Sequence, residues 1–234
     1  IITEGNNGKI WLAVLTTVAV GMVYGFINGV GVQLVKIPPL AMTLVMATVI
    51  NGIALAFTNG HPPTKVPKML KMIGRPLIGN IRTITVIVGL ILILTQVFLT
   101  YSRYGRTLYL VGSNRKASML SGIHVNIVVL SAYTLAGIYA CVSGVLLIGW
   151  VGNGQMGMGE PYTMMSVAAS VIGGAKLSGG HGTVIGTGLG AIVIVLMSNL
   201  LIAAGLSAGV RTFFEGMILI LILLVNNRAP KLRS

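Results

Sequence analysis

Long apolar runs without a single charge dominate this chain, and polar residues are concentrated in the segments between them. Each run exceeds the roughly 18 residues at which an apolar stretch becomes a candidate membrane-spanning helix. The residue-by-residue alternation typical of membrane β-barrels is absent from the sequence, so the runs predict helices. The windows without Asp, Glu, Lys or Arg are Ile10–Val35, Ile37–Gly60, Thr83–Ser102, Val125–Gly159 and Leu177–Val210.

Prolines, glycines and charges divide these runs into candidate helices. Pro38 and Pro39 separate the first two, and a proline-containing segment separates the second from the third. The fifth is too short for a full crossing, so we expect it to be tilted, broken or re-entrant. The candidates are Ile10–Leu34, Leu40–Phe57, Thr83–Tyr101, Asn126–Gly149, Tyr162–Ala175, Thr183–Ala204 and Thr212–Val225. The pattern predicts an all-α integral membrane protein with about seven transmembrane helices.

Composition agrees with this class. Hydrophobic residues make up 55% of the chain and charged residues only 8%, whereas soluble domains carry about 25% charged residues. The net charge of +13 would suggest nucleic acid in a soluble protein, but beside a membrane it is explained by attraction to anionic lipid headgroups. We therefore expect membrane lipid as a partner and no nucleic acid. Cys141 lies inside an apolar run, which indicates a small buried hydrophobe.

Glycines recur at every fourth position in two of the candidate helices. This spacing lines one helix face with small residues and lets neighbouring backbones approach closely, which predicts helix packing. The alternative is a face that slides or lines a path. The glycines are Gly21, Gly25 and Gly29 in the first helix and Gly182, Gly186 and Gly190 in the sixth.

One polar, basic segment, Arg103–His124, interrupts the apolar pattern. Ser113 or Asn114 is suited to cap a short helix that runs through Leu120, and Gly122 to end it. Arg115 and Lys116 would then project beside the membrane. A capped helix in such a segment suggests that a partner docks there.

Apparent catalytic and cofactor motifs fail on their context. Gly152, Gly154 and Gly157 have the GxGxxG spacing but follow an apolar helix, with no acidic residue about 20 positions on. The segment Gly174–Gly179 resembles the start of a phosphate-binding loop but lacks its lysine. The three histidines have no partners at metal-ligand spacing, and the chain has no Asp and only three Glu. We expect no cofactor, no metal and no enzymatic activity.

A few uncharged polar residues lie within the candidate spans. Amides and hydroxyls at membrane depth either bond a neighbouring helix or face a passage, and they suit a neutral hydroxylated solute better than an ion. The candidates for the translocation path are Asn51, Gln96, Ser198 and Asn199.

The distribution of Lys and Arg leaves the orientation open. With a cytoplasmic C-terminus, nine of them lie inside and seven outside, which is a weak preference under the positive-inside rule. Five of the outside charges belong to Lys65–Arg82, a candidate amphipathic surface helix.

Three segments in this order resemble permease subunits of ribose-type sugar ABC importers. KIPPLAMTLVMATVINGIAL (Lys36–Leu55) is similar to the family's entry to a span. RYGRTLYLVGSNRKASMLSGIHV (Arg103–Val125) is similar to its G-x-N-x-x-A-A-x-x-SGI segment. GMGEPYTMMSVAASVIGGAKLSGGHGTVIGTGLGA (Gly157–Ala191) is similar to its glycine-rich region, although Ser118 and Met164–Val167 depart from the family pattern.

The resemblance implies a permease of about ten membrane-spanning helices in the bacterial inner membrane. Residues 1–234 would be a single transmembrane permease domain that lacks the N-terminal spans. Residues 103–124 would be a cytoplasmic segment that couples to an ABC ATPase subunit, and Lys65–Arg82 would be periplasmic. The implied partners also include a periplasmic sugar-binding protein and a second permease subunit. The coupling residues would be Gly112, Asn114, Arg115, Lys116, Ala117, Leu120, Gly122 and Ile123.

Three alternatives remain open at this point. A branched-chain amino-acid ABC importer permease has a similar coupling region. A channel or ion-coupled carrier would work without an ATPase, although such proteins usually place charged residues at mid-span. A membrane enzyme is disfavoured by the lack of paired acids and bases in the sequence.

Overall fold

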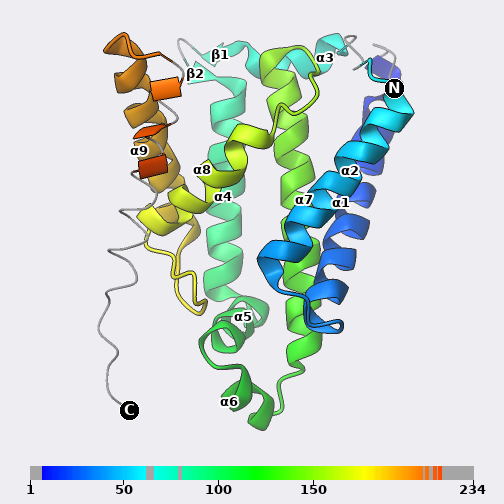
Figure 1. Cartoon of the computed structure of the whole chain (residues 1–234), viewed down its shortest axis with the longest axis vertical. Coiled ribbons are helices and arrows are strands. Elements are labelled where there is room, and N and C mark those ends of the chain that lie inside the picture. Colours follow the sequence, from blue (N-terminus) through cyan, green and yellow to red (C-terminus); the bar gives the residue numbers. More distant parts are fainter. Residues whose placement is uncertain are drawn as a thin grey trace. The chain divides into compact units, whose positions relative to one another are not determined.

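The computed structural model describes residues 7–61, 66–78, 81–207, 209–210, 213–214 and 216–217. Within this part of the chain, five helices are long and apolar enough to cross a membrane, which confirms the all-α membrane class (Figure 1). The seventh predicted helix, Thr212–Val225, lies almost wholly outside the described residues. The five are α1 (Ile10–Gln33, preceded by the 3-10 turn η1, Asn7–Lys9), α2 (Pro39–Thr58), α4 (Thr83–Tyr101), α7 (Val125–Val151) and α9 (Val184–Ala203).

Shorter elements lie between these helices. Two of them, α5 and α6, form the polar segment, where the sequence had predicted only the second as a helix. The fifth predicted helix is α8, which ends three residues earlier than expected. The shorter elements are α3 (Lys68–Lys71), the 3-10 turn η2 (Met72–Gly74), β1 (Pro76–Ile78), β2 (Ile81–Arg82), α5 (Arg103–Ser113), α6 (Arg115–Leu120) and α8 (Glu160–Ile172).

Local chemistry explains where the long helices begin and end. Pro39 is the first residue of α2, where its missing N–H costs no hydrogen bond. Asn59, with a φ of 49°, ends α2, and Gly152, with a φ of 75°, ends α7. These are the left-handed conformations that Asn and Gly adopt most readily. The Thr183 hydroxyl caps α9 by accepting a hydrogen bond from the Gly186 N–H at 3.1 Å.

Apolar side chains cover the outer surfaces of the long helices. Neither α2 nor α4 has a buried residue among those described. Leu44 on α2 and Leu90 on α4 are exposed, as are many other large apolar side chains. In water such a surface would cause aggregation, but in lipid it is the stable arrangement, because the backbone polar groups are satisfied within each helix.

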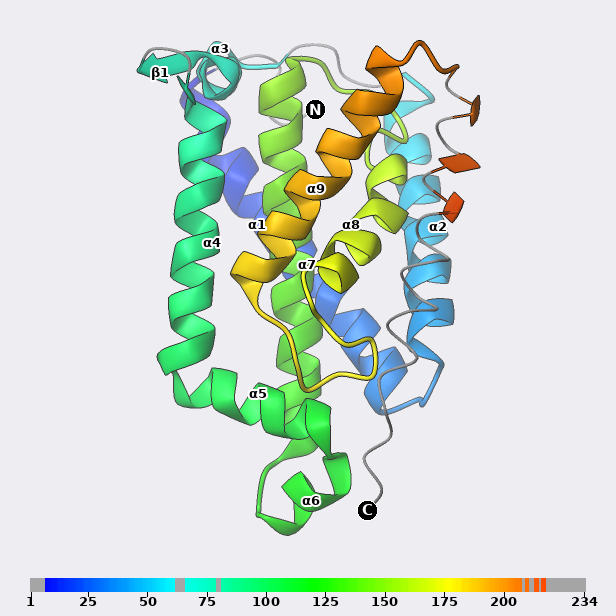
Figure 2. The ribbon, with the colours of Figure 1, turned by 90° about the vertical axis from the view of Figure 1, so that its left-hand side faces the viewer.

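Contacts divide the chain into two compact units. The first contains Ile1–Leu90 and Met119–Gly159, and the second contains Ile91–Ser118 and Glu160–Ser234. Helices α1 and α7 pack along each other in the first unit, and α8 and α9 do so in the second (Figure 2).

Glycines bring α1 and α7 into backbone contact. A Cβ atom added at Gly21 would lie 2.7 Å from the Gly137 carbonyl oxygen and 2.8 Å from the Cys141 Sγ. One at Gly25 would collide with the Tyr133 carbonyl oxygen, and one at Gly29 would lie 3.2 Å from Leu130 Cα. Close packing of this kind maximises dispersion contacts between helices in lipid.

The helix pair of the second unit uses the same device. A Cβ at Gly186 would collide with the Gly173 carbonyl oxygen, and one at Gly190 would collide with the Ala169 carbonyl oxygen. Gly182 lies before α9 rather than on it, and a Cβ there would lie 3.0 Å from Ala175 Cβ. The glycine series of the sixth predicted helix is therefore divided between a turn and a helix.

The segment Lys65–Arg82 is not one amphipathic helix. Its described residues form α3 and η2, followed by the antiparallel pair β1 and β2. Pro67 precedes α3 and Pro76 begins β1, and proline rings prevent a continuous helix across such a segment. We call α3, η2, β1 and β2 the basic platform.

Candidate functional site

Helix α5 leaves the end of α4 at a corner with a defined geometry. Ser102 caps α5 through its Oγ, which accepts the Gly105 N–H at 2.9 Å. A Cβ at Gly105 would collide with the Leu99 carbonyl oxygen, so only glycine allows the corner to close this tightly. The rings of Phe98 and Tyr104 pack across it with centroids 5.9 Å apart. The direction of α5 is thus set by α4.

Helix α6 is the short capped helix that the sequence predicts. The Asn114 Oδ1 accepts the Ala117 N–H at 3.0 Å, and the Ser118 hydroxyl donates to the Asn114 carbonyl oxygen at 2.9 Å. Ser118 is buried. Gly122, with a φ of 80°, follows the helix, in the backbone region that glycine adopts at low cost.

The outer face of α6 combines cationic and apolar side chains. Arg115, Lys116 and Ala117 are exposed, and Met119 and Leu120 are 62% and 90% exposed. Met119 and Leu120 together form a small exposed apolar patch beside two cations, which suits contact with a protein partner. Ile123, just beyond the helix, is half-buried.

A glycine-rich turn, residues 173–183, joins α8 to α9. Gly174, Gly179 and Gly180 have positive φ angles of 86°, 89° and 75°, and the Lys176 N–H donates to the His181 carbonyl oxygen at 3.0 Å. These conformations are strained for any residue with a Cβ.

Helix α5 holds this turn by its backbone. The Tyr109 hydroxyl donates to the Gly182 carbonyl oxygen at 2.8 Å, and the Ser113 hydroxyl donates to the Gly180 carbonyl oxygen at 3.4 Å. A Cβ at Gly112 would lie 2.6 Å from the Gly180 nitrogen. The segment that carries α6 therefore contacts directly the turn that begins α9.

Gln96 holds the same region from α4. Its Oε1 accepts the N–H groups of Val184 and Ile185 at 2.8 Å and 3.3 Å, and its Nε2 donates to Thr100 Oγ1 at 2.9 Å. The first N–H groups of a helix have no partner within the helix. Gln96 supplies that partner at the start of α9. Of the two roles that the sequence allowed for this amide, a bond to a neighbouring helix or a place facing the path, the structure shows the bond.

From the lengths of α8 and α4, we expect the turn to lie within the depth of the membrane. Helix α8 has 13 residues and covers about 20 Å, less than the hydrocarbon core. Helix α9 starts beside Gln96, and the rest of α4 beyond Gln96 covers about 8 Å. Irregular backbone at this depth is tolerated where protein groups satisfy it. Tyr109, Ser113 and Gln96 provide such groups here.

The other predicted path residues do not gather around this turn. Ser198 and Asn199 lie about 21 Å further along α9 than its first residue; Ser198 is half-buried and Asn199 is exposed. Asn51 lies on α2 in the other unit and is exposed.

Sequence reasoning missed one buried polar residue, Asn28 on α1. It is 2% exposed, and its Oδ1 has no hydrogen-bond partner in the structure. Its position three residues after Gly25, on the face that packs against α7, was the available signal. Gln33, at the end of the same helix, donates from Nε2 to Asn126 Oδ1 at 2.7 Å.

The chain's apolar helices and the polar α5–α6 segment define a multi-pass α-helical protein of the membrane, and comparisons place it in a family. Residues 1–223 match the family model described as branched-chain amino acid transport system / permease component. The chain belongs to this permease family. It is a multi-pass protein of the bacterial inner membrane and the membrane-spanning subunit of an ABC importer.

Several curated relatives are similar to this chain in sequence. The ribose import permease protein RbsC of Escherichia coli (strain K12) is 31% identical over 93% of this chain and 69% of its own length. RbsC of Bacillus subtilis (strain 168) is 32% identical over 86% of this chain and 63% of its own length. The autoinducer 2 import system permease protein LsrC of Photorhabdus luminescens is 31% identical over 92% of this chain and 65% of its own length. No solved structure matches the chain significantly.

Proposed function

We propose that this chain forms the passage through which an ABC importer moves a monosaccharide or a related small solute into the cell. The relatives named for ribose and autoinducer 2 import support this over a branched-chain amino-acid importer, although the family description mentions the latter. The near absence of charge in the spans agrees with a neutral solute. Both units would act as parts of a single permease domain.

We infer that α6 is the docking element for an ABC ATPase subunit on the cytoplasmic side. The capped helix offers Leu120 and Met119 as apolar anchors, with Arg115 and Lys116 beside them. A periplasmic binding protein would deliver the solute at the opposite side. A second permease subunit, identical or different, would complete the passage.

The contact between α5 and the glycine-rich turn carries the mechanistic proposal. Closure of the ATPases on nucleotide would displace α6 and, with it, α5. Because Tyr109 and Gly112 contact the turn at Gly182 and Gly180, that displacement would reach the start of α9. ATP hydrolysis would take place in the other subunit, while this chain converts the movement into opening and closing of the passage.

Three of the candidate path residues are proposed to contact the solute: Asn51, Ser198 and Asn199. Gln96 would act at the edge of the path, since its carbonyl oxygen is engaged by α9. A displacement of Gln96 together with the turn would change the width of the passage beside the start of α9.

Uptake by the reconstituted importer tests the proposed function. Proteoliposomes that contain the permease, its ATPase and its binding protein should accumulate a labelled monosaccharide. They should do so only when ATP is present on the side of the membrane that carries the ATPase. ATP-dependent uptake of leucine without sugar uptake would establish the amino-acid importer instead. Solute flux without the ATPase would establish a channel or carrier.

Substitution of Leu120 tests the docking element. Leu120→Gln removes the apolar anchor and should reduce co-purification of the ATPase at least about tenfold, because truncating an interface hot spot costs about 2 kcal/mol or more. Leu120→Met keeps an apolar side chain of similar size and should retain most of the binding. Full ATPase retention by Leu120→Gln would show that α6 is not the docking element.

A further inference from the structure

The basic platform carries charge that the proposed transport function does not use. Residues 61–82 contain five Lys and Arg and no Asp or Glu. Four of the cations belong to described residues and are exposed: Lys68, Lys71, Arg75 and Arg82. This segment therefore has no carboxylate of its own to neutralise them.

Three membrane spans fix the platform at a membrane boundary. Helix α4 starts at Thr83, directly after β2. A Cβ at Gly149, near the end of α7, would lie 2.9 Å from the Leu70 carbonyl oxygen, and one at Gly74 would lie 3.2 Å from the Trp150 carbonyl oxygen. The Asn7 side chain, beside the start of α1, accepts the Met69 N–H at 3.3 Å. The platform thus lies at the depth of the lipid headgroups.

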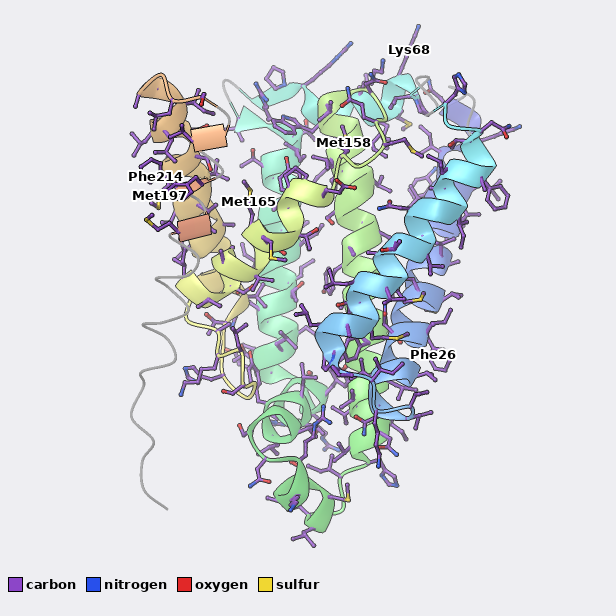
Figure 3. All side chains as sticks on the ribbon, in the orientation of Figure 1. Phe26, Lys68, Met158, Met165, Met197 and Phe214 are labelled. Carbon is purple, nitrogen blue, oxygen red and sulfur yellow. The ribbon has the colours of Figure 1, made fainter. Side chains whose placement is uncertain are left out.

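The platform has an inner and an outer surface of different character. Leu70 and Ile73 are half-buried and approach Gly149 of α7. The apolar side chains of Met69, Met72 and Ile81 are each more than half exposed. The Lys68 side chain extends away from the ribbon at α3 (Figure 3). Exposed apolar side chains next to cations are typical of segments that rest in the membrane interface, with stems in the acyl boundary and charges among the headgroups.

Backbone contacts fix the positions from which the side chains of Arg75 and Arg82 extend. The Thr83 N–H and Oγ1 both donate to the Arg75 carbonyl oxygen, at 3.0 Å and 3.1 Å. Pro76, the first residue of β1, pairs with Arg82 on β2, so the backbone of Arg75, one residue before β1, lies close to that of Arg82. Guanidinium groups bind phosphate oxygens in pairs of hydrogen bonds, which makes two neighbouring arginines suited to a phosphate group.

We propose that the basic platform binds the headgroups of anionic phospholipids in the leaflet at that end of the spans. Arg75 and Arg82 bind lipid phosphates, Lys68 and Lys71 add charge, and Met69 and Met72 contact the acyl region. The occupant is lipid rather than a soluble acidic protein because the exposed methionines and the span ends place the cations at the headgroup level. Binding of this kind anchors α4 and α7 at one boundary while their other ends, at α5 and α6, respond to the ATPase.

Retention of lipid by the intact importer tests this proposal. Complexes would be purified in nanodiscs of phosphatidylcholine with a minor fraction of phosphatidylglycerol, and the co-purified lipid measured by mass spectrometry. Arg75→Gln with Arg82→Gln should lower phosphatidylglycerol enrichment at least about tenfold, since each basic residue near an anionic surface contributes about fivefold. Lys36→Gln, a charge change between α1 and α2, is the matched control and should leave enrichment unchanged.

Two further arms keep the result decisive. Arg75→Lys with Arg82→Lys keeps the charge and should lose only part of the enrichment, because a lysine ammonium group cannot form the bidentate hydrogen bonds that a guanidinium group makes with a phosphate. In the unmodified protein, raising the salt concentration should weaken enrichment, as charge screening requires. Unchanged phosphatidylglycerol enrichment in the Arg→Gln variant, or a loss only of binding-protein affinity, would overturn the proposal and make the platform a protein-docking surface.

Discussion

Single glycines decide how closely the helices of this protein approach one another. A Cβ at Gly137 on α7 would lie 2.9 Å from Gly25 Cα and would collide with the Gly21 carbonyl oxygen. At Gly144, about two turns further along the same helix, a Cβ would meet nothing within 4 Å. The same residue type is required at one position and replaceable at the other.

Alanine substitution at these two glycines should therefore have opposite effects. Gly137→Ala is expected to lower the free energy of unfolding by about 1–3 kcal/mol, because the methyl group overpacks two backbones. Gly144→Ala is expected to raise it by up to about 1 kcal/mol, because alanine favours the helix and the space is open. Thermal unfolding of the purified protein in one detergent measures both. Equal effects would contradict the close contact of α1 and α7.

At the scale of the element, α5 is the connection between the proposed docking helix and the membrane part of its unit. Its start is set by Ser102 and Gly105 at the end of α4, and its later residues Tyr109 and Gly112 hold the glycine-rich turn. The turn has little regular structure of its own, so its position depends on these contacts. A short helix fixed at both ends can transmit a displacement without bending.

Loss of the Tyr109 hydroxyl should weaken this transmission. Tyr109→Phe removes the hydrogen bond to Gly182, worth about 1 kcal/mol, and leaves α6 intact. We expect normal ATPase co-purification and a several-fold fall in solute imported per ATP hydrolysed. Tyr101→Phe is the matched control, since Tyr101 is 78% exposed at the end of α4. A Tyr109→Phe importer with unchanged coupling would show that the turn does not relay the movement.

At the scale of the whole molecule, α4 separates two polar regions of different character. The basic platform precedes it and the α5–α6 segment follows it. Because a spanning helix places its ends on opposite sides of the bilayer, we expect these regions to face different compartments. The count of Lys and Arg could not choose between the two orientations.

Cysteine labelling should resolve the orientation. In a Cys141→Ala background, Lys68→Cys should react with a membrane-impermeant maleimide added to intact cells whose outer membrane admits it. Leu120→Cys should react only after the inner membrane is permeabilised. Both positions are exposed, so access to the reagent decides the result. The reverse pattern would place α6 outside and exclude docking to a cytoplasmic ATPase.

The spans were predictable because exclusion of charge is a property of each residue, whatever its neighbours in space. The predicted helix Thr83–Tyr101 coincides with α4. The predicted Ile10–Leu34 is one residue longer than α1 at its end, and Leu40–Phe57 is one residue shorter than α2 at each end. Lipid requires each spanning segment to satisfy its own backbone, so span bounds follow from local composition. The cap of α6 was predicted at Ser113 or Asn114 for the same local reason, and the structure shows it at Asn114.

The sequence by itself determined the membrane class, most span bounds and the capped helix at the polar segment. Only the tertiary structure decided which surfaces meet: Gly25 with Gly137 of α7, Gln96 with the start of α9, and Tyr109 with Gly182. The last two contacts join residues 88 and 73 positions apart. Such pairings depend on how whole helices are placed in space, which periodicity along one helix does not encode, whereas burial in lipid acts on every residue of a span separately.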